Sequence, residues 1–139
     1  MSETTKKTKC QEPGSYPNGI TEAEAHVMMI TVLKIFQRWN VSDVQACILL
    51  GAPSTRTFHL WKAGDTRFMP SDIIWRLGDI LGIHKAVRSM FVAPERGYEW
   101  IKLSNMAFGG KSALDRMLAG TPSDITAVRS YLDAGRGGW

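Results

Sequence analysis

The residues best suited to bind another molecule in the first half of the chain lie between positions 54 and 67. Small hydroxyl groups come first, followed by side chains that donate hydrogen bonds or carry positive charge: Ser54, Thr55, Arg56, Thr57, His59, Lys62 and Arg67. Hydroxyl groups at a helix start can hold phosphates, whereas Arg and His can reach the edges of DNA bases. This pattern predicts a DNA-binding site, with Lys62 and Arg67 as phosphate contacts.

The same residues also fit a plainer interpretation. Many all-α proteins contain two helices joined by a glycine turn, with a solvated polar face and no DNA role. Overall charge does not decide between the two, because 17 Lys+Arg against 13 Asp+Glu give a net charge of only +4. Both interpretations therefore stay open on this pattern alone.

Residue types that could support catalysis or hold a metal are present but scattered. The acidic residues fall at predicted helix starts and turns, with no pair placed for acid and base chemistry. His26, His59 and His84 lie on three different predicted helices, and none has a second ligand three or four residues away. Residues 109–111 lack the leading glycine of a phosphate loop. We therefore predict no catalytic residue, no metal site, no cofactor and no enzymatic activity.

The elements that position these residues are predicted to be helices throughout, because apolar residues recur at helical spacing and no segment alternates as a strand would. Capping boxes beginning at Thr21 and Ser42 start two helices, over about residues 21–39 and 42–50. Ser54 caps a third helix, in which Phe58 and Trp61 point inward. The segment from residue 42 to 64 therefore has the form of a helix-turn-helix.

Glycine and proline divide the rest of the chain. Ser71 is predicted to cap a helix that Gly82 separates from the next one, and Pro94 with Gly97 is predicted to break the chain again. A helix near residues 112–118 and a final helix from Thr121 follow. Apolar residues form one stripe along that last helix: Ile125, Val128 and Leu132.

The polar N-terminal stretch and the hydropathy pattern suggest where the protein works. Residues 1–20 are predicted to form a disordered lead without the apolar stretch of a secretory signal. No apolar run approaches the roughly 20 residues that cross a bilayer. Cys10 and Cys47 have neither metal-ligand spacing nor disulfide density, so we expect two reduced thiols. The predicted location is the cytoplasm, with no membrane contact.

Residues 100–134 resemble the toxin-binding domain of the Xre/MbcA/ParS antitoxins. The residues that carry this resemblance are Trp100, Asn105, Phe108, Gly109, Gly110, Lys111, Ser112, Ala113, Leu114 and Gly120, followed by residues 128–133. Upstream, residues 49–64 and 73–91 resemble the Xre-like helix-turn-helix half of the same antitoxins. Two departures are Ala113, where the family usually has Pro, and Pro53 in the helix-turn-helix turn, which puts the DNA-reading geometry in doubt.

The resemblance implies a type II antitoxin with a helix-turn-helix domain for DNA binding and dimerisation over residues 21–92 and a toxin-binding domain over residues 93–139. It implies a RES-domain, NAD-consuming toxin as partner, repression of its own operon at an operator DNA, and a homodimer. The implied toxin-binding residues are Trp100, Asn105, Phe108, Lys111, Arg129, Tyr131, Arg136 and Trp139. Core packing is the alternative for these aromatic residues, and for Trp100 it is the interpretation we accept.

The tail over residues 133–139 combines glycines with a cation, an aromatic ring and a terminal carboxylate. We predict that Arg136 and Trp139 plug the active-site cleft of the toxin, and a frayed chain end is the alternative. Two other functions stay open. One is a stand-alone helix-turn-helix regulator with a dimerising or ligand-sensing C-terminal part, and the other is an antitoxin that has lost DNA affinity.

Overall fold

The computed structural model describes residues 16–137, and every regular element in that range is helical. The predicted all-α fold is confirmed. In chain order the elements are η1 (Pro17–Gly19), α2 (Glu22–Arg38), α3 (Asp43–Leu50), α4 (Thr55–Lys62), α5 (Ile73–Met90), α6 (Pro94–Trp100), η2 (Met106–Phe108), α7 (Ala113–Met117) and α8 (Pro122–Gly137). No described helix is both long and apolar enough to cross a bilayer.

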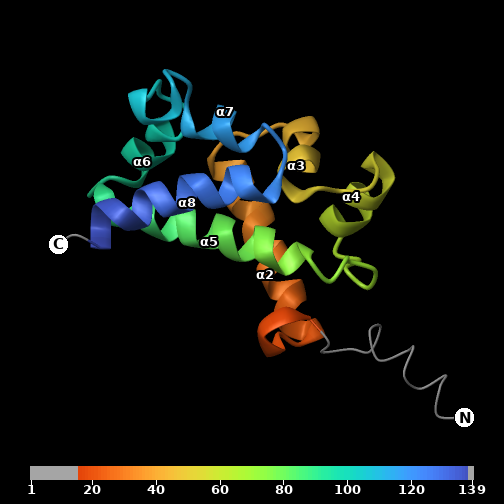
Figure 1. Ribbon diagram of the computed structural model, residues 1–139. Helices are drawn as coiled ribbons and strands as arrows, with labels where there is room; N and C mark the ends of the chain where they lie inside the picture. Colours follow the sequence, from red (N-terminus) through yellow and green to blue (C-terminus); the bar gives the residue numbers. More distant parts are fainter. Residues whose placement is uncertain (1–15, 138–139) are drawn as a thin grey trace, which may run out of the picture.

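Helices α5 and α8 form the centre of the molecule and lie side by side, running in the same direction (Figure 1). The Arg129 guanidinium of α8 fixes their register, because it donates hydrogen bonds to the Gly78 carbonyl and to Asp79 on α5, both at 3.2 Å. Helix α2 packs against α5 on another side, and α3 with α4 extends from this centre at the end opposite to α6. The arrangement makes α5 the helix that joins the two halves of the chain.

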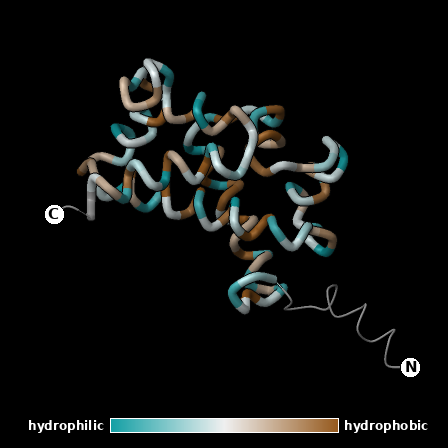
Figure 2. The backbone as a smooth tube through the Cα atoms, in the orientation of Figure 1, coloured by the Kyte–Doolittle hydropathy of each residue, from teal (hydrophilic) through white to brown (hydrophobic). Residues whose placement is uncertain are grey.

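One hydrophobic core includes residues from both halves of the chain. Figure 2 shows brown and teal positions alternating along the helices, as apolar and polar residues alternate on helical surfaces. Trp39, Trp61 and Phe58 are each about 1% exposed, and the predicted stripe of Ile125, Val128 and Leu132 is buried in the same cluster. The predicted inward direction of Phe58 and Trp61 is confirmed.

Local capping signals determine where the first helices begin. Thr21 and Glu24 form a reciprocal capping box at the start of α2, and Ser42 with Gln45 forms another at α3. The Ser54 side chain accepts a hydrogen bond from the Thr57 amide at 3.1 Å and so caps α4. All three caps follow the sequence prediction.

The predicted break at Gly82 is wrong, because α5 runs uninterrupted from Ile73 to Met90. A Cβ atom at Gly82 would lie only 2.5 Å from the Arg129 Cζ, so glycine allows Arg129 of α8 to cross α5 closely. The predicted cap at Ser71 is wrong as well, since Asp72 is the N-cap residue and its side chain makes no capping bond. The first amide of α5 is bonded instead by the Pro70 carbonyl.

The predicted break at Pro94 and Gly97 is also wrong, because both residues lie inside α6. Pro94 occupies the first turn, where a helix needs no amide donor. Gly97 is buried against α5, and a Cβ there would lie 2.6 Å from Cγ1 of Val87. Pro94 therefore helps α6 to begin, and Gly97 allows α6 to pack closely against α5.

The two chain ends differ in part from expectation. Residues 1–15 of the predicted lead lie outside the described residues, whereas Tyr16 and Ile20 pack against the core around the short turn of η1. At the other end α8 continues to Gly137. The predicted flexible tail is therefore helical over residues 133–137.

Candidate functional site

Helices α3 and α4, joined by a tight turn, form the first candidate surface, which we call the α4 surface. Gly51 ends α3 in the left-handed conformation (φ 65°), which a glycine adopts without strain. The guanidinium of Arg76 covers this turn and donates to the Leu49 carbonyl at 3.0 Å. Of the α4 residues predicted to bind DNA, Thr55, Arg56, His59 and Lys62 are exposed. The α4 surface thus consists of two short helices joined by a tight turn, with polar side chains that point outward.

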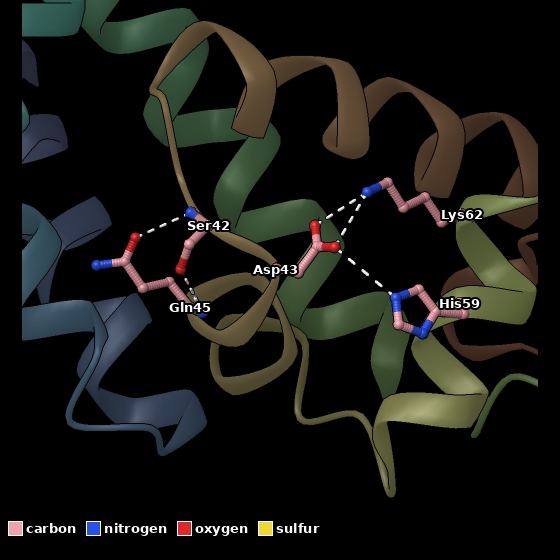
Figure 3. A network of polar contacts seen from close by, with 5 residues as sticks. All are labelled: Ser42, Asp43, Gln45, His59 and Lys62. Carbon is pink, nitrogen blue, oxygen red and sulfur yellow. Dashed lines mark hydrogen bonds and ion pairs between the residues drawn. The ribbon is translucent and has the colours of Figure 1, made fainter.

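One carboxylate engages two of the predicted DNA contacts. Asp43, at the start of α3, accepts hydrogen bonds from Lys62 at 3.0 and 3.2 Å, and its Oδ2 lies 3.7 Å from Nε2 of His59 (Figure 3). The Lys62 hydrogen bond lowers the pKa of the Asp43 carboxyl, and the charges of Lys62 and His59 lower it further. Asp43 therefore stays ionised and presents negative charge beside α4.

A second carboxylate holds Arg67. Its Nε and Nη2 both lie 2.9 Å from the oxygens of Asp65, and these hydrogen bonds lower the pKa of the Asp65 carboxyl. Arg56 differs, since among the described residues it forms no ion pair. Ser54 and Thr57 bond to each other through their hydroxyls at 3.1 Å. Of the predicted DNA contacts, Arg56 is the cation most available to a phosphate.

The second candidate surface begins with the closed loop of residues 104–112. The Asn105 amide bonds the Lys111 carbonyl, the Gly110 amide bonds the Asn105 carbonyl, and the Asn105 side chain accepts from the Ala107 amide at 2.9 Å. Ser104 donates to the Gly110 carbonyl. Gly109 and Gly110 both have positive φ (68° and 88°), which the loop needs to close. Asn105 thus shapes the loop, and Lys111 is exposed on it.

Phe108 connects this loop to α8. Its ring packs edge to face on Tyr131, with the centroids 5.1 Å apart. Tyr131 is 43% exposed and also lines an apolar groove of about 880 Å³ between the end of α5 and α8. We call this the C-terminal groove, and it is lined by Ser89, Met90, Phe91, Tyr131, Leu132, Ala134 and Gly135. Loop and groove together form a continuous candidate binding surface.

The other predicted toxin-binding residues are distributed differently. Arg129 is engaged inside the molecule, with bonds to α5 and an ion pair to Asp133 at 3.4 Å. Trp100 is partly buried and packs against the core. The Arg136 side chain and Trp139 lie outside the described residues. The structure thus brings Phe108 and Tyr131 together and gives Arg129 a structural role.

Three important residues were missed from the sequence. Met90 and Phe91 line the groove, and their signal was an apolar run, continued by Val92, that extends past the end of α5. Asp43 was taken as a helix-start charge, and no local signal places it beside Lys62, 19 residues later. Both roles depend on contacts between distant segments.

Comparison with known proteins gives matches for both halves of the chain. Residues 86–138 match the family described as the antitoxin Xre/MbcA/ParS C-terminal toxin-binding domain. Over 126 residues the chain is 44% identical to the uncharacterized protein y4oB of Sinorhizobium fredii (strain NBRC 101917 / NGR234), an alignment that covers 90% of this chain and 95% of that protein. No solved structure matches. The family match includes the loop and the C-terminal groove.

Proposed function

We propose a function from one premise: this chain belongs to the Xre/MbcA/ParS-type antitoxins and carries their toxin-binding domain over residues 86–138. In our proposal the toxin docks on the C-terminal groove and on the adjoining loop of residues 104–112. The observation that carries the proposal is the position of an exposed apolar groove within the matched segment. Exposed apolar surface of this kind is a common feature of protein interfaces.

The groove has the composition of an interface centre. Met90 and Tyr131 are each 43% exposed and Met106 of the loop is 87% exposed, so large apolar side chains face solvent. Aromatic residues and Met are enriched at interfaces, and a few such residues usually carry most of the binding energy. We therefore assign Met90, Phe108 and Tyr131 as the anchors for the toxin.

The finer parts of the proposal concern the partner and the operon. We propose that the partner is a RES-domain, NAD-consuming toxin and that Lys111 and the chain end, including Arg136 and Trp139, help block its active site. We further propose a type II system in the cytoplasm, in which a homodimer represses its own operon by binding operator DNA through the α4 surface. The outward position of Arg56 on the second of two short helices joined by a tight turn supports DNA binding.

A matched pair of variants tests the toxin site. Met90→Glu places a charge in the C-terminal groove, whereas Leu60→Glu places one on α4 at a residue of nearly equal exposure, 43% against 44%. We expect Met90→Glu to weaken capture of the neighbouring gene's product about 100-fold and Leu60→Glu to leave it unchanged, because burying an unpaired charge at an interface centre is costly.

The measurement is affinity pull-down after co-expression, with cellular NAD assayed in the same cells. Retention of the toxin by Met90→Glu at wild-type strength would refute the assigned site. Failure of the unaltered chain to bind the neighbouring product at all would favour the stand-alone regulator instead. Loss of NAD that the wild-type chain restores would identify the toxin as NAD-consuming.

A further inference from the structure

A small basic pocket lies between α2, α5 and α6. It has a volume of about 230 Å³, and its polar lining includes Lys34, Arg38, His84, Arg88 and Tyr98. In Figure 1, α6 lies at the end of the molecule opposite to α4, so this pocket and the α4 surface are distinct sites. Three different helices thus direct polar groups to one place.

The cations of this pocket are not neutralised. Within residues 16–137, no carboxylate lies within ion-pair distance of Lys34, Arg38 or Arg88. In the same range four other cations each hold a carboxylate. Like charges gathered around a hollow repel one another and create a positive potential. An anion in the pocket would relieve this repulsion.

His84 reports the same electrostatic environment. Burial lowers the pKa of its ring, and the charges of Arg88 and Arg38 lower it further. The ring stacks on Tyr98, with centroids 6.3 Å apart and planes at 11°. Its Nδ1 is buried without a hydrogen-bond partner among the described residues. Among the described residues no carboxylate is a cause of this pKa shift, so the titration of the ring is a sensitive probe of an anion in the pocket.

Helix dipoles explain part of the arrangement but not all of it. Arg38 and Arg88 lie in the last turns of α2 and α5, where a cation favourably faces the helix C-terminus. That effect accounts for each arginine separately. It does not account for Lys34, one turn earlier, or for the convergence of these side chains on a single hollow with His84 and Tyr98.

We propose that this pocket binds a phosphate group, supplied either by orthophosphate or by a small phosphomonoester. Two guanidinium groups match the planar, bidentate hydrogen bonding that phosphate oxygens accept, and Lys34 adds a third positive charge. The volume is several times the roughly 30 Å³ that one water molecule occupies in the liquid, which leaves room for the phosphate and part of an attached group. A phosphate bound here would hold α2, α5 and α6 together and stabilise the folded state.

The test follows the His84 ring signals by NMR and the melting temperature during titration with orthophosphate and, separately, ribose 5-phosphate. Sodium chloride at equal ionic strength gives the baseline. We expect saturable shifts of the His84 signals, a higher His84 pKa and a higher melting temperature. Tighter binding of ribose 5-phosphate identifies the phosphomonoester as the source, and equal binding identifies orthophosphate as sufficient. A response that sodium chloride reproduces would refute the proposal.

Variants make the test specific to the pocket. Arg88→Gln should weaken phosphate binding about tenfold or more, as expected for loss of a charge-assisted contact. Arg38→Gln should act similarly and serves if Arg88→Gln melts at a lower temperature without ligand. Lys85→Gln removes the same charge from the same helix outside the pocket lining and should leave binding unchanged. Equal losses of phosphate binding in Lys85→Gln and Arg88→Gln would overturn the assignment. So would His84 shifts on addition of duplex DNA when neither orthophosphate nor ribose 5-phosphate causes any.

Discussion

The α4 surface and the C-terminal groove differ in what they leave available to a partner. On the α4 surface, Asp43 occupies Lys62 and His59, and nearby Asp65 occupies Arg67, so most of the expected cations are already paired. In the C-terminal groove, large apolar side chains remain exposed and the adjoining loop is closed by its own hydrogen bonds. The positive charge of the α4 surface is thus partly cancelled, whereas the apolar groups of the C-terminal groove are exposed.

This difference indicates how tightly each surface can bind its proposed partner. Exposed ion pairs are weak, and a phosphate can replace a carboxylate only if the gain exceeds the repulsion from that carboxylate. An apolar groove in a rigid frame needs no such exchange, since binding buries surface that water already solvates poorly. We therefore expect strong toxin binding and weak, salt-sensitive DNA binding.

The largest expected effect concerns the chain end beyond the groove. Deletion of residues 136–139 removes the proposed plug but none of the core residues described above. We expect a folded protein whose neutralisation of the toxin falls at least about 100-fold, as for loss of an interface hot spot. Growth of toxin-expressing cells is the measurement. Full rescue by the truncated chain would show that the groove alone neutralises.

The next effect concerns the cation of α4 that has no ion-pair partner in residues 16–137. Arg56→Ala should weaken retention of the DNA upstream of the gene about tenfold, because one arginine contact to DNA is worth that order of discrimination. Toxin capture should not change. A gel shift at fixed salt measures the effect, and unchanged retention would remove Arg56 from the DNA contacts.

A smaller effect in the opposite direction comes from Asp43. Asp43→Asn removes the charge that holds Lys62 and His59 and repels phosphate, so DNA retention should increase about threefold to fivefold, with a steeper dependence on salt. Asp115→Asn is the matched control. It removes an exposed carboxylate from α7 and should have no effect on DNA retention. If the two variants behave alike, only net charge matters.

The smallest expected effect separates structural from binding arginines. Arg129→Gln removes two of the hydrogen bonds between α8 and α5 and should lower the free energy of unfolding by about 1 kcal/mol. Lys62→Gln breaks an exposed pair and should not change stability measurably. Thermal melts compare the two. If Arg129→Gln melts normally yet loses the toxin, Arg129 is a toxin contact.

Local signals predicted the parts of the fold that local chemistry determines. Capping boxes at Thr21 and Ser42 and the inward direction of Phe58 and Trp61 each depend on residues within a turn of one another. The same kind of reasoning failed at Gly82, where a glycine normally weakens a helix but here allows close crossing by another helix. A glycine can either end a helix or allow another helix to cross closely, and only the tertiary contact distinguishes the two cases.

The candidate sites were predictable to a different extent. The loop of residues 104–112 is a contiguous stretch, so its residues could be named from the sequence. The C-terminal groove joins the end of α5 to α8 across about 40 residues, and the Asp43 network joins two helices. Such sites appear only when the helices have been packed, because their register depends on distant contacts such as that of Arg129 with Asp79.

The parallel pairing of α5 and α8 has a consequence during protein synthesis. Ile80 and Ile83 of α5 belong to the cluster that Ile125 and Val128 of α8 complete, and α8 leaves the ribosome after α5. A nascent chain that stops before α8 therefore exposes the apolar side of α5 and is open to chaperones and proteases. The helix that carries Tyr131, a proposed anchor for the toxin, thus also completes this cluster, so we expect chains without α8 to lack both stability and the ability to neutralise.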